Sequence, residues 1–459
     1  MQTTGSVNPE LQMQAEKYVG TGYQRLLSFE APGGGFSLFG KAPADTFLTA
    51  YGLMLLNDMA RVYPVEEAVI ERAANWLLAE QRSYGNWWGG DLRSGGDALG
   101  ATAYVAWALI DAGYEDTPGM SRAIAYLRDN ALAEKDPYSL ALAANALVAY
   151  APRDPVAQDV LDALYEARVV DGDTVYWQMG KASFMGATGE TGSVETTALA
   201  AYAFQRAASS PDAVSGALAY LVQRKDAWGT WGTTQATILS LKALLLASEQ
   251  PGRAEGPATL QVSLNNGLTQ EIAIDGTNAD VVHLVTFDRG FSPTGQNQVQ
   301  IDLGGGGNLM YQVTTHYYLP WDEVPVPPPD EQPLTIEVRY DRTELAVNDE
   351  VTVDVGVRLN QEGLVRMALI DLGVPPGFSV LTEDLGKLVE QGQIARYELT
   401  GRQVIIYLED FSYEAPLYFS YRLRARFPMR AQTPPSSAYD YYNPDRLAMQ
   451  APLLVTVNE

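Results

Sequence analysis

The most informative segment of the chain is Gln81-Arg-Ser-Tyr-Gly-Asn-Trp-Trp-Gly89, which is followed by Ala101-Thr-Ala-Tyr-Val-Ala-Trp-Ala-Leu-Ile110. Residues 70–80, just before it, repeat apolar side chains at helical spacing and predict an amphipathic helix. Residues 101–110 are apolar almost all round, and a helix without a polar face is buried among other elements. Amphipathic helices that alternate with apolar ones indicate an outer and an inner ring, which is the arrangement of a helical toroid.

The same pattern recurs along residues 10–247. An aromatic, glycine-rich turn ends an outer helix, and the next inner helix opens with a small hydroxyl residue beside alanine. Copies lead from residues 24–40 into Thr49, from 81–89 into Thr102 and from 223–231 into Thr237, with weaker copies leading into Ser139 and Thr196. A recurrence every roughly forty to fifty-five residues is typical of stacked helical hairpins.

These turns predict structural roles for their most regular residues. Glycine permits a tight turn, an aromatic side chain fills the gap between neighbouring hairpins, and glutamine can bond free backbone groups at a helix end. In the two clearest copies these residues are Gln81, Gly85, Trp87, Gln223, Gly229 and Trp231.

After residue 250 the pattern changes from helical to strand-like. Leu260, Val262 and Leu264 alternate with polar residues, and Asn266-Gly267 is a strong hairpin signal. Further strands are expected at 281–287 and 299–303.

Longer alternating runs follow a proline-rich stretch and predict a second all-β unit, a sandwich. The fold class is therefore multidomain α + β, an α/α toroid followed by a small β unit and a β-sandwich. The expected boundaries are a toroid at 1–252, a small β unit at 253–323, a stiff linker at 324–333 and the sandwich at 334–459.

Composition excludes several functions. The 459 residues include 56 Asp and Glu against 31 Lys and Arg, so the formal charge of −25 argues against sequence-independent nucleic-acid binding. Because the chain has no cysteine, disulfides, zinc–thiolate sites and cysteine nucleophiles are excluded. Neither a secretory signal nor a run of about twenty apolar residues, the length that spans a bilayer, is present in this sequence.

The order of these units, together with particular residues, resembles one family. Lys17-Tyr-Val-Gly-Thr-Gly-Tyr-Gln-Arg-Leu26, Gly34-Gly-Phe-Ser-Leu-Phe-Gly40 and Thr49-Ala-Tyr51 resemble the thioester domain of α2-macroglobulins and complement proteins, just downstream of its reactive site. Pro375-Pro-Gly-Phe378 and Ala438-Tyr-Asp-Tyr-Tyr-Asn-Pro444 resemble the C-terminal macroglobulin-like domain, which binds receptors in animal members. The tail motif is the most specific part of the resemblance.

The resemblance implies a protease trap. In thioester-bearing members, cleavage of a bait region triggers a collapse around the protease, which a strained Cys–Gln thioester then acylates. That chemistry needs a Cys-Gly-Glu-Gln type segment, and this chain has no cysteine. We therefore expect the C-terminal portion of a bacterial-type, broad-spectrum endopeptidase inhibitor, which is not an enzyme and has no catalytic residues, thioester, metal or cofactor.

The family also implies what surrounds such a portion. The chain is expected to begin downstream of the thioester helix and to contain only the second half of a CUB-like unit, so a sheet edge or face should be incompletely covered. Its expected partners are upstream macroglobulin-like domains and, through the full-length parent, proteases. The family implies an extracellular or periplasmic location.

Helical toroids also occur in enzymes. The spacing of Gln81, Gly85 and Trp87 matches the Gln-x-x-x-Gly-x-Trp repeat of terpene cyclases, from which the copy at Gln223 departs by two residues. The aspartate-rich acid of such cyclases has one near match, Asp171-Gly-Asp173, in an expected loop where turn formation is the simpler explanation.

Zinc-dependent toroid enzymes need Cys and His ligands. The only histidines, His283 and His316, lie beyond the toroid and among alternating apolar or aromatic residues, which favours structural packing.

The alternative function from another class is a polysaccharide lyase or glycan-binding module. Candidate stacking platforms and acids are Trp87, Trp88, Trp177, Trp228, Trp231, Asp91, Glu190 and Glu195. Glycosidic cleavage requires paired carboxylates. Turn packing and helix capping explain the same residues more simply, so the inhibitor interpretation is favoured.

The last candidate site is a possible recognition surface made of Tyr439, Asp440, Tyr441 and Tyr442. Aromatic residues that alternate between core and surface along a strand would give the same pattern. Of the family's receptor-contact lysines, only Lys387 has a possible counterpart here.

Overall fold

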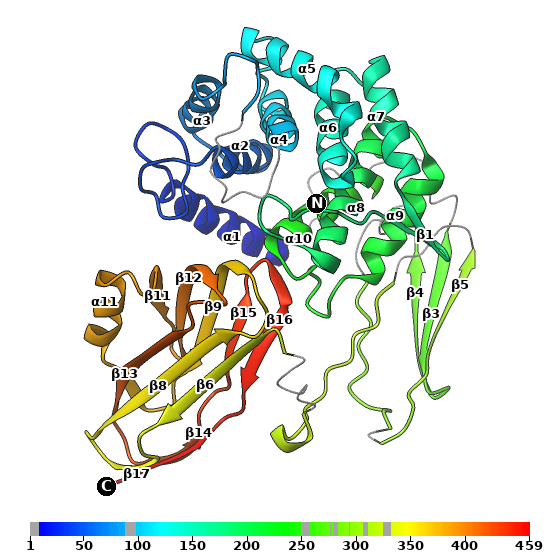
Figure 1. Ribbon diagram of the computed structural model, residues 1–459. Coiled ribbons are helices and arrows are strands. Elements are labelled where there is room, and N and C mark those ends of the chain that lie inside the picture. Colours follow the sequence, from blue (N-terminus) through cyan, green and yellow to red (C-terminus); the bar gives the residue numbers. More distant parts are fainter. Residues whose placement is uncertain are drawn as a thin grey trace.

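The computed structural model describes residues 9–87, 98–248, 257–275, 278, 283–292, 294–305, 311–324 and 332–459. Helices form the first half of the described chain, a small sheet follows, and a larger β domain ends it (Figure 1). The multidomain α + β architecture predicted from the sequence is confirmed.

The helical part consists of two concentric sets of helices. The inner set is α2 (Thr46–Ala60), α4 (Ala98–Asp111), α6 (Pro137–Tyr150), α8 (Gly189–Arg206) and α10 (Thr234–Ser248). The outer set is α1 (Pro9–Leu27), α3 (Glu67–Ala79), α5 (Pro118–Asn130), α7 (Pro155–Glu166) and α9 (Pro211–Gln223). Each inner helix from α2 to α8 packs against the next inner helix and against the outer helix that follows it in sequence (Figure 1).

Local sequence sets where many of these helices begin. Asp45, Thr117, Asp136 and Asp154 each cap a helix by accepting a hydrogen bond from a backbone N–H of the first turn. In the last three cases a proline follows the cap directly, at a position where its missing N–H costs nothing.

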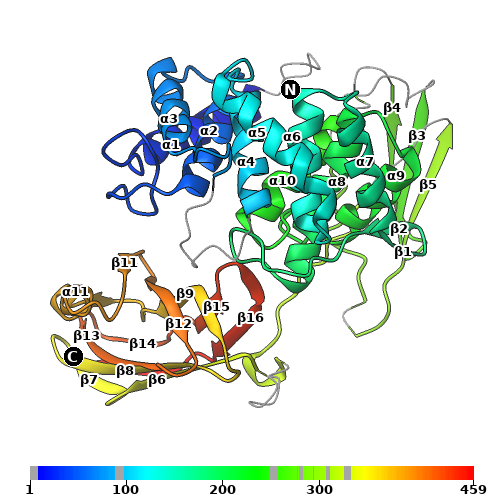
Figure 2. The same cartoon turned by 45° about the horizontal axis from the view of Figure 1, so that its top comes forward.

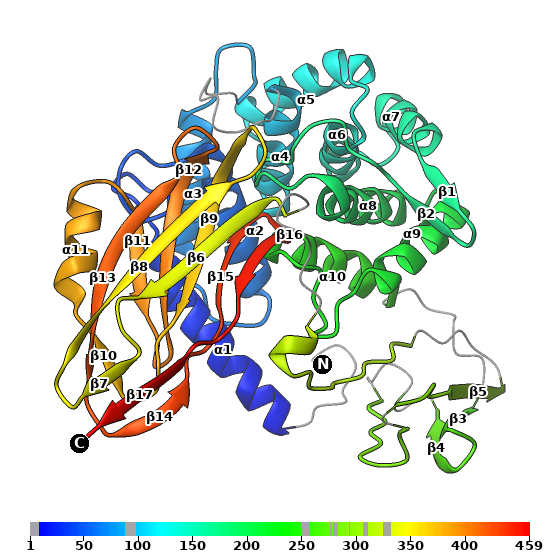
Figure 3. The same cartoon turned by 60° about the horizontal axis from the view of Figure 1, so that its bottom comes forward.

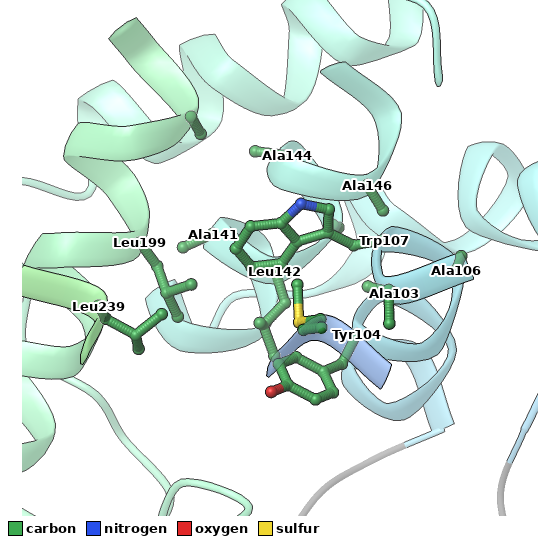
Figure 4. Close-up of a cluster of buried hydrophobic side chains, with 14 of the residues drawn as sticks. Ala103, Tyr104, Ala106, Trp107, Ala141, Leu142, Ala144, Ala146, Leu199 and Leu239 are labelled. Carbon is green, nitrogen blue, oxygen red and sulfur yellow. The ribbon is translucent and has the colours of Figure 1, made fainter. Parts of the chain in front are cut away.

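The apolar helices predicted to be internal form the toroid core. Side chains of α4 and α6 meet those of α8 and α10 around Trp107, which is 1 % exposed (Figure 4). The labelled members are Ala103, Tyr104, Ala106, Trp107, Ala141, Leu142, Ala144, Ala146, Leu199 and Leu239. Many are alanines, so the inner helices approach one another closely.

Side-chain amides join successive inner helices. Asn57 of α2 donates to the carbonyl of Asp111 at the end of α4 (2.8 Å), and Asn145 of α6 donates to that of Leu199 in α8 (2.9 Å). Gln205 of α8 donates in the same way to Ala243 of α10 at 3.1 Å. These bonds fix the relative height of the helices, because a slide by one turn would leave a buried donor unpaired.

The small sheet contains β3 (Ala258–Leu264), β4 (Leu268–Ile274) and β5 (Val299–Gly305), in the order β4-β3-β5. The turn at Asn265 to Gly267 joins β3 and β4, as the Asn-Gly signal predicts. The strand expected at 281–287 is not found: residues 281 and 282 lie outside the described residues, and 283–287 belong to no strand. Periodicity alone predicted it, but the described chain supplies no neighbouring strand to pair with it.

The C-terminal domain is a β-sandwich with its own apolar core. One sheet has the order β10-β13-β8-β6 and the other β11-β12-β9-β15-β16, with a smaller sheet β14-β17-β7. Bounds are β6 Leu334–Tyr340, β7 Glu344–Ala346, β8 Glu350–Leu359, β9 Leu364–Gly373, β10 Phe378–Val380, β11 Arg396–Leu399, β12 Gln403–Ser412, β13 Leu417–Ala425, β14 Met429–Gln432, β15 Ser436–Asp440, β16 Asn443–Gln450 and β17 Leu454–Asn458. A helix, α11 (Thr382–Glu390), was not expected from the sequence.

The sandwich lies against one side of the toroid. Figure 2 shows it below the helices, with β15 and β16 at the edge nearest to them. The small sheet lies beside the toroid, and the segment after β5 leads back toward the sandwich (Figure 3). The expected linker at 324–333 is outside the described residues from 325 to 331.

Candidate functional site at the contact between toroid and sandwich

A five-residue turn recurs in the described toroid, at residues 31–35, 82–86, 183–187 and 226–230. In every copy the first residue donates its N–H to the carbonyl of the fifth, and the fourth residue donates to the carbonyl of the first, over 2.7 to 3.2 Å. The fourth residue is a glycine with φ between +85° and +99°: Gly34, Gly85, Gly186 and Gly229. Glycine adopts this left-handed conformation without steric cost.

In three copies the turn is anchored to the following inner helix. The next residue is a buried aromatic whose backbone N–H donates to a threonine hydroxyl: Phe36 to Thr49 (2.9 Å), Trp87 to Thr102 (3.1 Å) and Trp231 to Thr237 (3.0 Å). The indole N–H groups of Trp87 and Trp231 bond the carbonyls of Leu77 and Leu221, at 2.6 and 2.7 Å. The repeated threonines therefore satisfy backbone donors at the turns.

The residues that directly precede these turns do not all make the same contacts. Gln81 donates to the carbonyls of Gly85 (2.9 Å) and Gly119 (2.8 Å) and accepts from Arg122 of α5 at 2.7 Å. In the last copy Lys225 occupies the position that corresponds to Gln81. Gln223 lies two residues earlier and is exposed.

The copy at 183–187 is anchored to the sandwich instead. The residue after it is Thr188, whose backbone N–H and hydroxyl both donate to Oδ1 of Asn443, at 2.8 and 3.0 Å. Nδ2 of Asn443 in turn donates to the carbonyl of Gly186 at 3.1 Å. A side chain of the C-terminal domain thus takes the place that an inner-helix threonine has in the other copies.

Asn443 is held in position by its own domain. Its Nδ2 also donates to Oδ2 of Asp440 (2.9 Å), which lies 3.3 Å from Nη1 of Arg446. The other oxygen of Asp440 accepts from the backbone N–H of Tyr442 at 3.0 Å. Burial raises the pKa of Asp440, and the hydrogen bond from Asn443 opposes this rise.

The tail motif packs on the toroid through two further residues. A Cβ built on Gly186 would lie 3.4 Å from the ring of Tyr442, and one built on Gly232 would lie 3.2 Å from Cγ of Pro444. Of the predicted recognition cluster, Asp440 is buried, Tyr439 and Tyr442 are partly buried, and only Tyr441 is exposed, at 38 %. Most of this cluster therefore faces protein rather than solvent.

The toroid and the sandwich each match a known domain family. Residues 1–246 match the family described as the A-macroglobulin TED domain. The chain belongs to the α-macroglobulin family. Residues 364–452 match the A-macroglobulin receptor binding domain, so the resemblance read from the sequence is confirmed.

Relatives of this macroglobulin chain are distant in sequence. Thioester-containing protein 1 of Anopheles gambiae, allele S1, is 23 % identical over 463 residues, which are 96 % of this chain and 32 % of the relative. Allele R1 is 22 % identical over the same shares of both proteins. The chain therefore spans about a third of the length of the curated relatives it matches.

Solved macroglobulins share its fold. Native Escherichia coli α2-macroglobulin, spanning domain MG7 to the C-terminus, has a TM-score of 0.69 at 18 % identity, covering 97 % of this chain and 68 % of that one. Salmonella α2-macroglobulin reacted with methylamine has a TM-score of 0.64 at 17 % identity, covering 100 % and 28 %. The fold of the chain is therefore similar to part of the region of native Escherichia coli α2-macroglobulin that runs from domain MG7 to the C-terminus.

Directly behind the 183–187 turn, the macroglobulin toroid buries a carboxyl group. Glu195 of α8 is 1 % exposed, and neither carboxyl oxygen makes a hydrogen bond of normal geometry to a described residue. Burial raises the pKa of Glu195 to about 8, although the nearby Ser183 hydroxyl has a smaller, lowering effect. Ser183 is the first residue of the turn, so the carboxyl lies next to the segment that binds the sandwich.

The structure separates the residues considered for glycan chemistry. Trp87, Trp177 and Trp231 are buried at turns, whereas Trp228 is 82 % exposed and lies 5.8 Å from the ring of His316. Glu190 is exposed and paired with Arg224 at 2.6 Å, while Glu195 is buried. Trp88 and Asp91 lie outside the described residues. The described tryptophans and acids therefore form no stacking platform with two carboxylates.

The remaining sequence candidates have structural surroundings. Asp171 ends β1 (Val169–Asp171), and Asp173 precedes β2 (Thr174–Tyr176) in the same small hairpin. Nε2 of His283 lies 3.0 Å from the carbonyl of Asn278. Lys387 is in the last turn of α11. Within the part of the chain that the structure describes, no group of His, Asp and Glu could hold a metal ion, and no helix is long and apolar enough to cross a membrane.

Proposed function

We propose that this chain serves as the C-terminal region of an α-macroglobulin-type endopeptidase inhibitor, in which it supplies a docked toroid and sandwich and no covalent chemistry. The observation that supports this most is the contact of Asn443 with Gly186 and Thr188. A trap that changes conformation needs domains whose positions are coupled, and a contact made of part-buried hydrogen bonds couples them. The chain contains no cysteine and so cannot itself form a thioester.

Exposed apolar side chains after the small sheet, together with the edges of that sheet, support a role beside further macroglobulin-like domains. Tyr311, Val313, Tyr317 and Leu319 are 63, 52, 73 and 44 % exposed in a segment that belongs to no described strand. The outer strands β4 and β5 of the small sheet each have a single neighbour among the described strands. We assign the sheet edges to pairing with the other half of a CUB-like unit and the exposed apolar side chains to contact with upstream macroglobulin-like domains, because unpaired edges and apolar patches associate readily.

The surface can be tested on the chain alone. It is expected to self-associate or to bind an apolar dye, and Tyr317→Lys together with Tyr318→Lys should reduce both effects. A chain that remains monomeric and binds no dye would contradict this assignment.

The inhibitor function is tested with the protein as its cells produce it. After incubation with trypsin or elastase, entrapment should block hydrolysis of a large protein substrate and leave hydrolysis of a small peptide amide unchanged. Loss of both activities would indicate a blocked active site instead, and loss of neither would overturn the proposal. Since such traps meet foreign endopeptidases, we place the protein outside the cytoplasm, in an extracellular or periplasmic space.

The absence of covalent coupling is a separate expectation for this chain. Treatment with methylamine or an activated protease should leave the mass of the chain unchanged, and a covalent adduct would overturn the expectation that it forms no covalent bond. We also propose that it is not an enzyme, since the candidate tryptophans and acids that the structure describes do not assemble into a glycan site. Binding on a glycan array or lyase activity on uronate polymers would favour that alternative.

A further inference from the structure

A cleft of about 540 Å³ lies between the toroid and the sandwich, and it involves none of the residues of the Asn443 contact. Its toroid side comes from the end of α1 and the loop after it, with Arg25, Phe29, Phe39 and Lys41. Its sandwich side comes from the start of β11, with Arg396 and Glu398. Figure 1 shows α1 above the ends of β9, β11 and β12, where these two sides meet.

The cleft is basic in an acidic chain. Arg25, Lys41 and Arg396 carry positive charges and Glu398 carries the one negative charge of the lining, so three minus one leaves a net charge of +2. The chain as a whole has a charge of −25. A local positive site in a negative field marks a place where an anion is attracted although the rest of the surface repels it.

The single carboxylate is shared between both arginines. Oε1 of Glu398 lies 2.5 Å from Nη2 of Arg396 and 3.6 Å from Nη2 of Arg25. The pair with Arg25 is weak because that side chain is 64 % exposed and screened by water. Lys41 has no ion pair with any described residue. Much of the positive charge therefore remains available to a ligand.

The backbone next to Lys41 is fixed by a close approach that needs no ligand. Gly40 has a φ of +68°, and a Cβ on it would lie 2.3 Å from the carbonyl oxygen of Ser28, so only glycine fits there. This close approach returns the loop to the end of α1, so that Lys41 and Arg25 both line the cleft. On the other side, the guanidinium of Arg396 lies 5.8 Å from the ring centre of Tyr407, which limits its freedom.

We propose that this cleft binds a small multivalent oxyanion, of the pyrophosphate or phosphate-ester class, between Arg25, Lys41 and Arg396. Guanidinium groups bind phosphate oxygens through paired hydrogen bonds, and an ammonium group adds a point charge. Phe29 and Phe39 give the cleft apolar wall that the organic part of a phosphate ester can contact. Because both domains contribute cations, the bound anion stabilises their docked arrangement by mass action.

The test is a calorimetric titration of the full chain with inorganic pyrophosphate, at an ionic strength kept constant with sodium chloride. One site per chain is expected, with weaker binding of orthophosphate. Arg25→Gln and Arg396→Gln should each weaken binding about tenfold or more, as the loss of charge-assisted hydrogen bonds predicts. The matched control is Arg339→Gln, because Arg339 is an exposed sandwich arginine that is paired with Glu337.

Three results would overturn the proposal. The first is the absence of saturable binding at constant ionic strength, and the second is equal weakening by Arg339→Gln, which would indicate general screening. The third is orthophosphate binding as tight as that of pyrophosphate, which would show that the second phosphoryl group gains nothing from having cations on both sides of the cleft.

The bridging of the two domains by the anion is tested by hydrogen exchange. Saturating pyrophosphate should slow exchange in both 28–41 and 395–398, and Lys41→Gln should reduce the effect on both. Protection of one side alone would contradict bridging.

Discussion

Oδ1 of Asn443 in the sandwich accepts a hydrogen bond from the backbone N–H of Thr188 in the toroid at 2.8 Å, although 255 residues separate them in sequence. In the equivalent turns, the same backbone N–H bonds a threonine of the neighbouring inner helix. The toroid thus presents one of its repeated turns outward, and the C-terminal domain hydrogen-bonds to it through the buried amide of Asn443.

Removing that amide should weaken the contact between the domains. Asn443→Ala leaves the N–H of Thr188 and the carbonyl of Gly186 without their partner, at a cost of about 1–3 kcal/mol. Hydrogen exchange in residues 183–188 should become faster, whereas the exposed control Gln432→Ala should leave it unchanged. Unaltered exchange in the Asn443 variant would show that other contacts hold the domains.

Buried and exposed tryptophans should differ in their effect on toroid stability. Trp177 is fully buried and its indole N–H donates to the carbonyl of Leu164 at 2.7 Å. Trp177→Phe removes this bond and leaves a cavity, so the free energy of toroid unfolding should fall by about 2–4 kcal/mol. Trp228→Phe, at an 82 % exposed position, should change it by less than about 0.5 kcal/mol. Equal effects in denaturant titrations would refute the assigned burial.

The buried carboxyl of Glu195 should make stability depend on pH. Its pKa rises from the ordinary 4.5 to about 8 on folding, so the folded state binds more protons than the unfolded state between these values. Stability is therefore full below about 4.5 and falls as pH approaches 8, by at most about 1.4 kcal/mol per unit. The groups that face it, Tyr51, Tyr104 and Tyr138, stay neutral there because burial raises their pKa values.

The matched variant for this effect is Glu195→Gln, which keeps the shape and removes the ionisation. Its free energy of unfolding should show a flatter pH profile between 5 and 8 than that of the parent chain. Parallel profiles would assign the pH dependence to other groups.

An ion pair links the last inner helix to α2. Nζ of Lys242 in α10 lies 2.6 Å from Oδ2 of Asp58 in α2, with the lysine side chain 20 % exposed. A double-mutant cycle with Lys242→Met and Asp58→Asn should give a coupling of about 1 kcal/mol, since partial burial reduces screening. The exposed pair of Arg339 with Glu337 should couple near zero in the same assay. Equal couplings would indicate that the link contributes nothing specific.

Much of the fold follows from local pattern. The all-apolar run of α4 and the alternation along β6 and β8 each follow the burial of successive residues, which periodicity encodes directly. Gly85 and Gly229 have a positive φ and are followed two residues later by Trp87 and Trp231, so this part of the turn pattern acts within a few residues.

The candidate site was harder to predict from the local sequence pattern. The spacing of Gln81 and Gln223 suggested equivalence, yet only Gln81 bonds the turn, because Lys225 has the corresponding position in the last copy. Trp228 and Trp231 lie three residues apart, yet they are 82 % and 4 % exposed, because only Trp231 has the place after the turn that Trp87 has in its own copy. Two tryptophans so close together in sequence do not by themselves indicate which of them the neighbouring helix covers.

The sequence by itself determined the toroid, the sandwich, the acidic charge and the lack of a thiol, because these depend on composition and on spacings within single elements. Only the tertiary structure decided that the side chain of Asn443 makes the hydrogen bonds to Gly186 and Thr188, and that Arg25 and Lys41 meet Arg396 across a cleft. Both arrangements depend on how two separately folded domains dock. Docking brings together residues that are hundreds of positions apart, and no local periodicity specifies such pairs.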